Sequence, residues 1–421
     1  MHTSERLYYS DSFMRTFTSA VTGARELARG EGGFFWQLSL DHSAFYPTSG
    51  GQPFDTGVLR ASLAGEAMRE LLVEQVEEDE DGTVWHYVPE PLATGTRVEG
   101  EIDWVRRFDH MQQHTGQHLL SAVFVRELQM PTVSFHLGES ISMIDITGGL
   151  PAHPSLERVE RIANEIIFED RPVTTSYARR DEAEAMRAAG DLRKLPDRQG
   201  TIRLIEIADC DRNACGGTHV RSTGQIGALL LRGAEKVSRG VRVEFVCGFR
   251  AVSAARTDAS ILGKTRGLLS TGAPDLPETV NRLLTEAKTS EKVRQKLREE
   301  LAGFQAGELA REVPIDNGLR LVVREWKDRD RDFVRLLASR TAAAAPSTAV
   351  IFCAKEANKV SVFVARSSDL GLNCGRILRE ALVPLGLRGG GSPDLAQGEV
   401  PAELESVLVA SVTNAIRSSI A

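Results

Sequence analysis

Short apolar runs, several of them alternating with polar residues, set the pattern of the first hundred residues. The runs at residues 34–40 and 84–88 are bounded by Gly, Asp and Pro, which is typical of strands. Between them, the stretch TSGGQP at residues 48–53 has the composition of a tight turn. The pattern therefore predicts a small, β-rich barrel or sandwich over residues 1–100.

Helical and strand-like periods are mixed in the next segment. Helical spacing begins near Asp109 and continues to about Leu128, and a second amphipathic stretch covers residues 156–169. Strand-like runs follow at residues 201–207, 228–231 and 241–246. We expect an α+β core over residues 101–255.

Apolar residues recur at spacings of three and four through residues 277–312, with Lys, Arg and Glu between them. This spacing predicts a long amphipathic helix that begins near Pro277, inside a helical linker over residues 256–315. The apolar stripe can pack on its own domain or pair with a second copy of the chain. A homodimer through this helix or through the C-terminal domain therefore stays open.

Strand and helix patterns alternate again at the C-terminal end, which predicts a small α/β domain over residues 316–421. The expected elements are a strand, a helix, two strands and a helix, at residues 319–323, 332–345, 349–353, 360–365 and 374–385. The predicted fold class is α+β, with a small N-terminal β-barrel domain, an α+β core, a helical linker and this last domain.

Composition and the N-terminal residues bear on the cellular location of the protein. The chain has 421 residues, of which 42% are apolar and 26% charged, and no apolar run approaches the ~18–20 residues of a membrane span. The N-terminal residues include Glu5, Arg6 and Asp11 without an apolar stretch, so we expect no signal peptide, no membrane partner and a cytoplasmic location. Five cysteines, an odd number, suit a reducing compartment better than a disulfide framework.

The net charge of −7 argues weakly against a nucleic-acid partner, but its distribution softens that argument. Residues 1–100 hold 7 Lys and Arg against 16 Asp and Glu, a net charge of −9, and the remaining residues have a net charge of +2. The acidic run at residues 77–81 is typical of a solvated loop. The rest of the surface can still present basic side chains to phosphates.

The stretch HMQQHTGQH at residues 110–118 places three histidines at intervals of four. Residues four apart on a helix lie on one face, with Cβ atoms about 5–6 Å apart, so either His110 with His114 or His114 with His118 can share a metal ion. The glutamate of an HExxH zinc protease is absent, so the sequence does not support that mechanism.

A second motif, CGGTH at residues 215–219, joins a cysteine and a histidine through two glycines. A tight turn there can aim Cys215 and His219 at one point, although Cys215 taken alone is better interpreted as a small buried thiol. Together with His114 and His118 they form a nitrogen and sulfur donor set of the kind that Zn²⁺ prefers. Catalytic zinc usually keeps one position open, so we expect His219 to be the ligand that is held most loosely.

These motifs resemble those of a known family. HTGQHLL at residues 114–120 and CGGTHV at residues 215–220 are similar to the paired zinc motifs of the alanyl-tRNA editing domain, which occurs in alanyl-tRNA synthetase and in free-standing editing proteins. FYPTSGGQPFDTG at residues 45–57 resembles the glycine-rich motif of its small β-domain. RGGGSPDLAQG at residues 388–398 resembles the C-terminal glycine-rich motif of the long form, in its DHHA1-like domain.

The resemblance implies a zinc-dependent hydrolase that removes serine, with glycine as a second candidate, from alanine-specific tRNA. Zinc would lower the pKa of a water molecule or position the substrate, and both roles stay open. Nothing in the chain resembles the ATP-dependent activation domain of the synthetase, so we do not expect it to charge tRNA.

Three further groups of residues are assigned roles as hypotheses. The expected substrate pocket is made by Thr48, Ser49, Gly50, Gly51, Gln52, Ser134 and His136. The groups expected to orient the metal ligands are Asp109 and Thr218, with Arg107. The basic residues expected to contact RNA phosphates are Arg203, Lys236 and Arg242, with Arg232.

Other functions remain in competition with alanyl editing. Threonyl-tRNA synthetase has a related editing domain, and DHH-class phosphodiesterases share a similar C-terminal domain, although the Asp-His-His signature is missing here. From a different class, the chain could be a non-catalytic tRNA-binding protein in which zinc is structural.

Overall fold

The computed structural model describes residues 4–27, 36–61, 68–192, 195, 200–327 and 329–420. The chain divides into two compact units, Met1–Thr265 and Arg266–Ala421, and each is described by itself. Phe34 and Phe35, the start of the first predicted strand, lie outside the described residues. Every helix in the described part of the chain is too short or too polar to span a bilayer.

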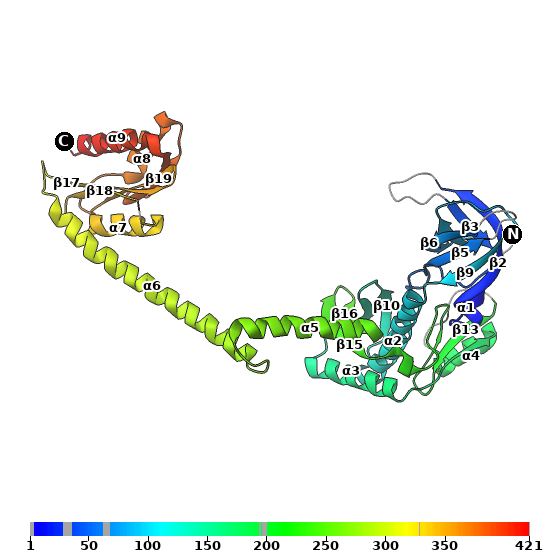
Figure 1. Ribbon diagram of the computed structural model, residues 1–421. Coiled ribbons are helices and arrows are strands. Elements are labelled where there is room, and N and C mark those ends of the chain that lie inside the picture. The colour runs from blue at the N-terminus through cyan, green and yellow to red at the C-terminus, as the bar shows by residue number, and fades with distance from the viewer. Residues whose placement is uncertain are drawn as a thin grey trace. The chain divides into compact units, whose positions relative to one another are not determined.

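A curved sheet forms the N-terminal part of the first unit (Figure 1). Its strands are β2 (Thr16–Glu26), β3 (Trp36–Leu40), β5 (Gly57–Ala61), β6 (Arg69–Val73), β7 (Gln75–Glu78), β8 (Val84–Val88) and β9 (Arg97–Ile102). They pair in the order β6-β5-β9-β2-β3-β8-β7. The edge strands β6 and β7 are consecutive in the chain and β6 contacts β8, so the sheet is nearly closed. Alternate side chains fill its interior, among them Leu38, Leu59 and Val84.

A short parallel pair lies beside this sheet. β1 (Glu5–Arg6) pairs with β4 (His42–Ser43), and the single turn α1 (Leu7–Ser10) follows β1. Tyr8 of this turn is buried against Tyr46, with ring centroids 5.1 Å apart. The N-terminal segment is therefore anchored next to the glycine-rich loop of residues 48–53.

The central helix of the first unit is α2 (Trp104–Leu128). Asp103 caps it by accepting a hydrogen bond from the backbone N–H of Arg106 at 3.1 Å. A four-stranded antiparallel sheet packs on α2 in the order β10-β11-β16-β15; its strands are β10 (Thr132–Leu137), β11 (Ser142–Ile146), β15 (Leu229–Val237) and β16 (Gly240–Cys247). Gly116 allows close contact, since a Cβ there would lie 2.3 Å from Sγ of Cys247.

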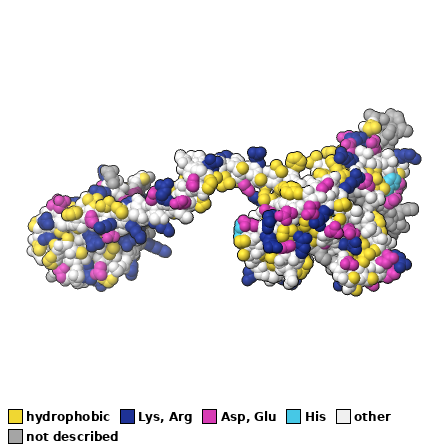
Figure 2. Space-filling model, turned by 90° about the horizontal axis from the view of Figure 1, so that it is seen from below, with side chains coloured by type: hydrophobic (Ala, Val, Ile, Leu, Met, Phe, Trp, Pro, Cys, Tyr) yellow, Lys and Arg dark blue, Asp and Glu magenta, His cyan; other side chains and the backbone are white. Residues whose placement is uncertain are grey.

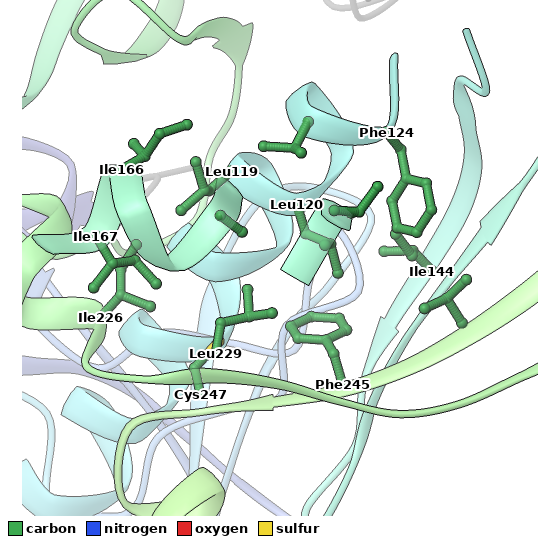
Figure 3. Close-up of a cluster of buried hydrophobic side chains, with 14 of the residues drawn as sticks. Leu119, Leu120, Phe124, Ile144, Ile166, Ile167, Ile226, Leu229, Phe245 and Cys247 are labelled. Atoms are coloured by element: carbon green, nitrogen blue, oxygen red, sulfur yellow. The ribbon is translucent and has the colours of Figure 1, made fainter. Parts of the chain in front are cut away.

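The apolar core between this helix and this sheet is shown in Figure 3. Leu119, Leu120 and Phe124 of α2 meet Ile144 of β11 and Phe245 of β16. A second helix, α3 (His153–Phe168), adds the buried side chains Ile166 and Ile167 to the same cluster. The core thus fixes the position of α2, which carries the histidines.

The remaining elements that begin in the first unit are a small sheet, which leads into the cysteine motif, and three helices. β12 (Val173–Ala178), β13 (Ile202–Ile207) and β14 (Asp211–Ala214) form an antiparallel sheet in chain order. The helices are α4 (Arg180–Ala189), the 3-10 turn η1 (Thr223–Ile226) and α5 (Gly248–Leu269). Because β14 ends at Ala214, Cys215 starts the loop directly after a strand.

The second unit is a sheet covered by helices on both faces (Figure 1). Its strands are β17 (Arg320–Trp326), β18 (Thr348–Glu356), β19 (Lys359–Arg366), β20 (Gly389–Gly391) and β21 (Leu395–Pro401), in the order β17-β18-β19-β21-β20. Its helices are α6 (Leu276–Glu312), α7 (Arg331–Ala343), α8 (Cys374–Leu382), η2 (Val383–Leu385), η3 (Ala402–Leu404) and α9 (Glu405–Ser418).

Alternation along β18 explains the two covered faces of this sheet. Val350 and Phe352 pack with α7 and the end of α6, whereas Ile351 and Cys353 pack with α8 and α9. A strand that is buried on both faces reads as a continuous apolar run. Ala302 and Ala306 join the first of these clusters, so the last turns of α6 belong to the core of the second unit.

The α+β class, the barrel-like N-terminal sheet and the C-terminal α/β unit are confirmed. The presence of zinc in the core and the domain limits at residues 100, 255 and 315 stay predictions.

Candidate metal centre

His114 and His118 lie one turn apart on the buried side of α2. Their ring centroids are 5.3 Å apart, as i,i+4 spacing requires. His110, one turn earlier, is also buried but does not belong to the cluster of potential metal ligands found among the described residues. Of the two histidine pairs that the sequence left open, the structure brings His114 and His118 to the cysteine motif.

The loop of residues 215–219 is folded back by an arginine. Nη1 of Arg203 donates hydrogen bonds to the carbonyl oxygens of Cys215 at 2.9 Å and Gly217 at 2.8 Å. A side chain at Gly217 has no room, because a Cβ there would lie 2.2 Å from Cε1 of His114. The second glycine of the motif therefore lets the loop lie directly against the His114 ring.

The four predicted ligand residues converge at this point. One potential ligand atom from each of His114, His118, Cys215 and His219 lies within 4.8 Å of all the others. Sγ of Cys215 is 3.4 Å from Nε2 of His114 and 3.2 Å from Nε2 of His219. The three imidazoles are buried, so a cation here would be enclosed by protein. The cluster is a candidate metal site.

The Nδ1 atom of each imidazole in the cluster lies within hydrogen-bonding distance of a neighbouring side chain. The Nδ1 partners are Oε1 of Gln52 for His114 at 2.8 Å, Oδ2 of Asp211 for His118 at 3.2 Å and Oγ1 of Thr115 for His219 at 3.1 Å. Such partners fix the ring orientation and the tautomer of metal-bound histidines. Here they turn Nε2 of His114 and His219 toward Cys215.

The electrostatics of the cluster favour a thiolate. Burial alone would raise the pKa of Cys215, but the adjacent His114 and His219 outweigh burial and hold this pKa well below its usual value. Burial also lowers the pKa of His219, to about 3. For His118 burial is outweighed by hydrogen bonds to Asp211 and Cys215, which raise its pKa to about 9. A deprotonated thiol is the form that binds metal ions.

The glycine-rich loop delivers Gln52 to the cluster. Ser49 and Gln52 pair across a hairpin, and Gly50 and Gly51 have φ of 54° and 85°, as a type I′ turn requires. The Gln52 side chain is fully buried, donates to Oγ1 of Thr218 at 2.9 Å and accepts from the Thr218 backbone N–H at 3.1 Å. Thr218 thus orients Gln52, and Gln52 contacts His114.

The predicted pocket residues divide into two groups. Thr48, Ser49, Gly50 and Gly51 are exposed on the hairpin beside Gln52. Ser134 and His136 are exposed on β10, and Ser134 donates to Oδ2 of Asp145 at 2.8 Å.

Phe135, between Ser134 and His136, is the β10 residue that faces the cluster. Its ring centroid is 5.6 Å from that of His114, and a Cβ on Gly51 would lie 2.7 Å from it. Since successive side chains of a strand point to opposite faces, Ser134 and His136 point away from the side that Phe135 occupies.

Asp109 and Arg107 were expected to orient the histidines, but their side chains bond to other groups. Asp109 accepts hydrogen bonds from Arg250, with Nη2 at 2.5 Å, and from Gln113 at 3.2 Å. It lies five residues before His114, about 140° around the helix, and so faces another direction. Arg107 forms a fully buried ion pair with Asp55, in which Nε lies 2.9 Å from Oδ2.

Of the basic residues expected to contact RNA, Arg203 and Arg242 have protein partners. Arg203 is bonded to the cysteine loop, and Arg242 pairs with Asp145 at 2.9 Å. Arg232 likewise pairs with Asp258 at 2.5 Å, and Lys236 is exposed on β15. Figure 2 shows basic and acidic side chains interspersed over the face in view.

Comparison with known proteins decides the family. The model of the threonyl and alanyl tRNA synthetase second additional domain matches residues 202–244, and the DHHA1 domain model matches residues 318–418. The chain is 30% identical over 416 residues to the alanyl-tRNA editing protein AlaX-L of Pyrococcus horikoshii, covering 96% of each chain. The chain belongs to the AlaX-L family of alanyl-tRNA editing proteins.

Alanine–tRNA ligases are similar to this AlaX-L family member over part of their length. The ligase of Pyrococcus abyssi is 33% identical over 403 residues, which cover 94% of this chain and 42% of the ligase. Among solved structures, the C-Ala domain of Aquifex aeolicus alanyl-tRNA synthetase matches 24% of this chain and 93% of that domain, at 20% identity and a TM-score of 0.22.

Sequence reasoning missed three residues that contact the cluster or its ligands. Thr115 lies inside the histidine motif, directly after His114. A hydroxyl beside a predicted ligand was a weak indication that it orients a metal-binding histidine. Asp211 lies four residues before Cys215, at the start of the strand that leads into the motif. An acidic residue so close to a predicted ligand was the available indication of its role. Phe135 carried no polar signal.

Proposed function

We propose that this AlaX-L family protein is a trans-editing hydrolase that removes serine from alanine-specific tRNA, with Zn²⁺ bound by His114, His118, Cys215 and His219. The observation that supports this best is the convergence of three oriented imidazoles and one thiol within 4.8 Å. Family membership supplies the substrate class, and the cluster supplies a site for the chemistry.

The donor set fits Zn²⁺ on its chemistry. Imidazole nitrogen and thiolate sulfur are typical zinc ligands, the thiol pKa is lowered, and all three imidazoles have outer partners. When bound, zinc would polarise the ester carbonyl or a water molecule. Whether His219 is the most loosely held ligand stays a prediction, because it is buried and has an outer partner like the other two histidines.

The residues around the cluster supply binding and orientation. Gln52 and Thr218 brace His114, and the exposed hydroxyls of Thr48 and Ser49 lie on the hairpin that carries Gln52. A site that hydrogen-bonds a substrate hydroxyl discriminates strongly against an analogue without it. We therefore assign Thr48 and Ser49 to recognition of the serine hydroxyl, and Lys236 to contact with tRNA phosphate.

The test is deacylation of three alanine-specific tRNAs charged with serine, glycine or alanine, together with threonine-specific tRNA charged with serine. We expect fast loss of serine from alanine-specific tRNA, with alanine spared. Preferential loss from threonine-specific tRNA would assign the chain to the threonyl type of editor. No loss from any substrate by metal-loaded, folded protein would favour a non-catalytic tRNA-binding role.

A further inference from the structure

A group of three aromatic rings lies where α2 begins. The ring centroids are 5.3 Å apart for Phe13 and Trp104, 5.6 Å for Trp104 and Phe108, and 6.4 Å for Phe13 and Phe108. All three rings are partly buried against the core of the first unit. Two arginines cover them: Cζ of Arg15 is 4.2 Å from the ring centroid of Trp104, and Cζ of Arg221 is 4.1 Å from that of Phe13. These five residues are called the aromatic–arginine patch.

The two guanidinium groups of the patch are open to solvent. Arg15 is exposed and has no ion-pair partner among the described residues. The side chain of Arg221 is 63% exposed, and Asp11 pairs with its Nη2 at 3.2 Å. In the described part of the chain, Nε and Nη1 of Arg221 have no partner. Stacking holds each guanidinium over its ring, while the N–H groups at its edge can still donate hydrogen bonds.

The indole N–H of Trp104 is a further donor in the patch. It has no hydrogen-bond partner within the residues that the structure describes. The side chains of the patch thus contain two arginine groups and one indole N–H that donate, and no group that accepts. Phosphate oxygens accept hydrogen bonds and carry negative charge, so a phosphate matches this set of donors.

The patch continues along α2 toward the proposed reaction site. Trp104 and Phe108 are four residues apart, and Thr115 follows seven residues later, so all three lie on one stripe of the helix. The hydroxyl of Thr115 lies 3.1 Å from Nδ1 of His219 and accepts from the backbone N–H of Val220 at 3.2 Å. The helix between Trp104 and Thr115 is about 16 Å long, a distance that a few nucleotides can span.

We infer that the aromatic–arginine patch binds the sugar–phosphate backbone of the tRNA 3′ end, with Arg15, Arg221 and the indole N–H of Trp104 donating to phosphate oxygens. The inference rests on the proposed function, because the ester at the cluster is attached to the last nucleotide of the tRNA. The nucleotides before it are single-stranded and carry one phosphate each. A strand that leaves the cluster along this stripe of α2 brings those phosphates to the patch.

The salt dependence of tRNA binding tests the phosphate contacts. Each contact to a single strand contributes about 0.7 to the slope of log affinity against log salt concentration, so Arg15→Gln and Arg221→Gln should each make that slope shallower by about this amount. Arg15→Lys keeps the charge and should keep the slope. Arg161→Gln is the matched control, because it removes an exposed arginine on α3 that pairs with Glu165, and it should bind tRNA like the wild type.

Two substrates separate the patch from the reaction site. With serine-charged alanine tRNA, Ser-tRNA(Ala), each glutamine variant should raise KM about 2- to 5-fold, as expected for loss of one exposed ion pair, and leave kcat unchanged. The seryl ester of adenosine has no phosphate, so the variants should hydrolyse it at the wild-type rate. A tRNA without its single-stranded 3′ end should bind the wild type and both variants with the same slope. Melting curves check that the variants are folded.

The outcomes distinguish the two proposals. If the wild type deacylates Ser-tRNA(Ala) but Arg15→Gln and Arg221→Gln keep the wild-type slope and KM, the patch is wrong and the editing function stands. Slower hydrolysis of the adenosine ester by these variants, or a difference in slope that persists with the shortened tRNA, would also contradict the placement of the 3′ end. If the slope depends on the patch but no seryl ester is hydrolysed, the editing function is wrong and the RNA contact stands.

Discussion

At the scale of single residues, Gly217 defines how closely the cysteine loop approaches α2. A Cβ at this position would lie 2.2 Å from Cε1 of His114, 2.4 Å from its Nδ1 and 2.9 Å from Oε1 of Gln52. Both the ligand and its partner would have to move. The glycine is therefore needed for space at the cluster.

Gly217→Ala should weaken metal binding by about 10- to 100-fold, the range seen when groups that orient metal ligands are disturbed. Competition with a chromophoric chelator measures this affinity. Gly216→Ala is the matched control, since a Cβ there meets only the Tyr9 ring, with the hydroxyl oxygen nearest at 3.4 Å. Equal zinc affinity in both variants would contradict this role of Gly217.

His86 is a second residue whose surroundings make a prediction. It is fully buried in the N-terminal sheet, where Nδ1 lies 3.0 Å from the carbonyl oxygen of Leu38 and Nε2 lies 2.8 Å from Oγ of Ser43. One donor and one acceptor satisfy the neutral ring. Burial lowers the pKa of His86 to about 4, against 6.5 for an ordinary histidine.

Because the pKa of His86 is depressed in the folded state, its contribution to stability is complete above pH 6.5 and is lost as the pH falls from 6.5 toward 4. At pH 5.5 the loss is about 1.4 kcal/mol. Urea unfolding of wild type and His86→Gln at pH 7.5 and 5.5 measures it. The advantage of the wild type over the variant should shrink by that amount, and a constant difference would show that His86 does not titrate this way.

At the scale of elements, the ion pair between Asp55 and Arg107 joins the glycine-rich loop to α2. Both side chains are fully buried, and Arg107 also donates to the carbonyl oxygens of Ser12 and Ala44. Asp55 follows Gln52 on the same loop and accepts from the backbone N–H of Tyr46 at 2.6 Å. The pair thus helps to position Gln52 behind His114.

Asp55→Ala should lower the free energy of unfolding by about 3–5 kcal/mol, because it leaves a buried arginine without its counter-charge. Glu70→Ala is the control: it breaks a solvent-exposed pair with Arg60 in the same sheet and should leave the urea midpoint close to that of the wild type. Equal urea midpoints for the two variants would contradict a structural role for the buried pair.

The elements show where sequence reasoning succeeds and where it fails. Strong periodic patterns predicted α6 and the strands β8, β18 and β19 to within three residues. The helix has apolar residues at spacings of three and four, and each strand contains a continuous or alternating apolar run. The start of α2 was set five residues too late, since Asp103 caps it before the histidine pattern begins. Local patterns were sufficient to predict that these helices and strands exist, but they predicted the first and last residues less accurately.

The site follows the same division. The spacing of four paired His114 with His118 and Cys215 with His219, because spacing is a local property. The two pairs were joined by their donor types and by the family resemblance. Asp211 and Gln52 reach the histidines from 93 and 62 residues away, and no local pattern encodes such a meeting. The buried, polar face of α2 has the same explanation: Gln113, for example, bonds to the backbone of Cys247.

At the scale of the whole molecule, the four proposed ligands all lie in the first unit. The second unit matches the DHHA1 domain model and has its own two-sided core. Apolar residues such as Leu284, Leu297 and Phe304 are exposed on α6. Pairing through this helix stays a prediction.

The most direct test of the central claim is zinc titration of metal-stripped protein, followed by the rate of Ser-tRNA(Ala) deacylation. The account predicts that the deacylation rate rises in proportion to added zinc and reaches its maximum at one zinc per chain. Added zinc should not restore the rate of Cys215→Ala. The melting temperature of that variant should remain close to that of the metal-free wild type. A metal-free protein that deacylates Ser-tRNA(Ala) at the full rate, or a Cys215→Ala variant that does so, would contradict the claim that these four residues form a catalytic zinc centre.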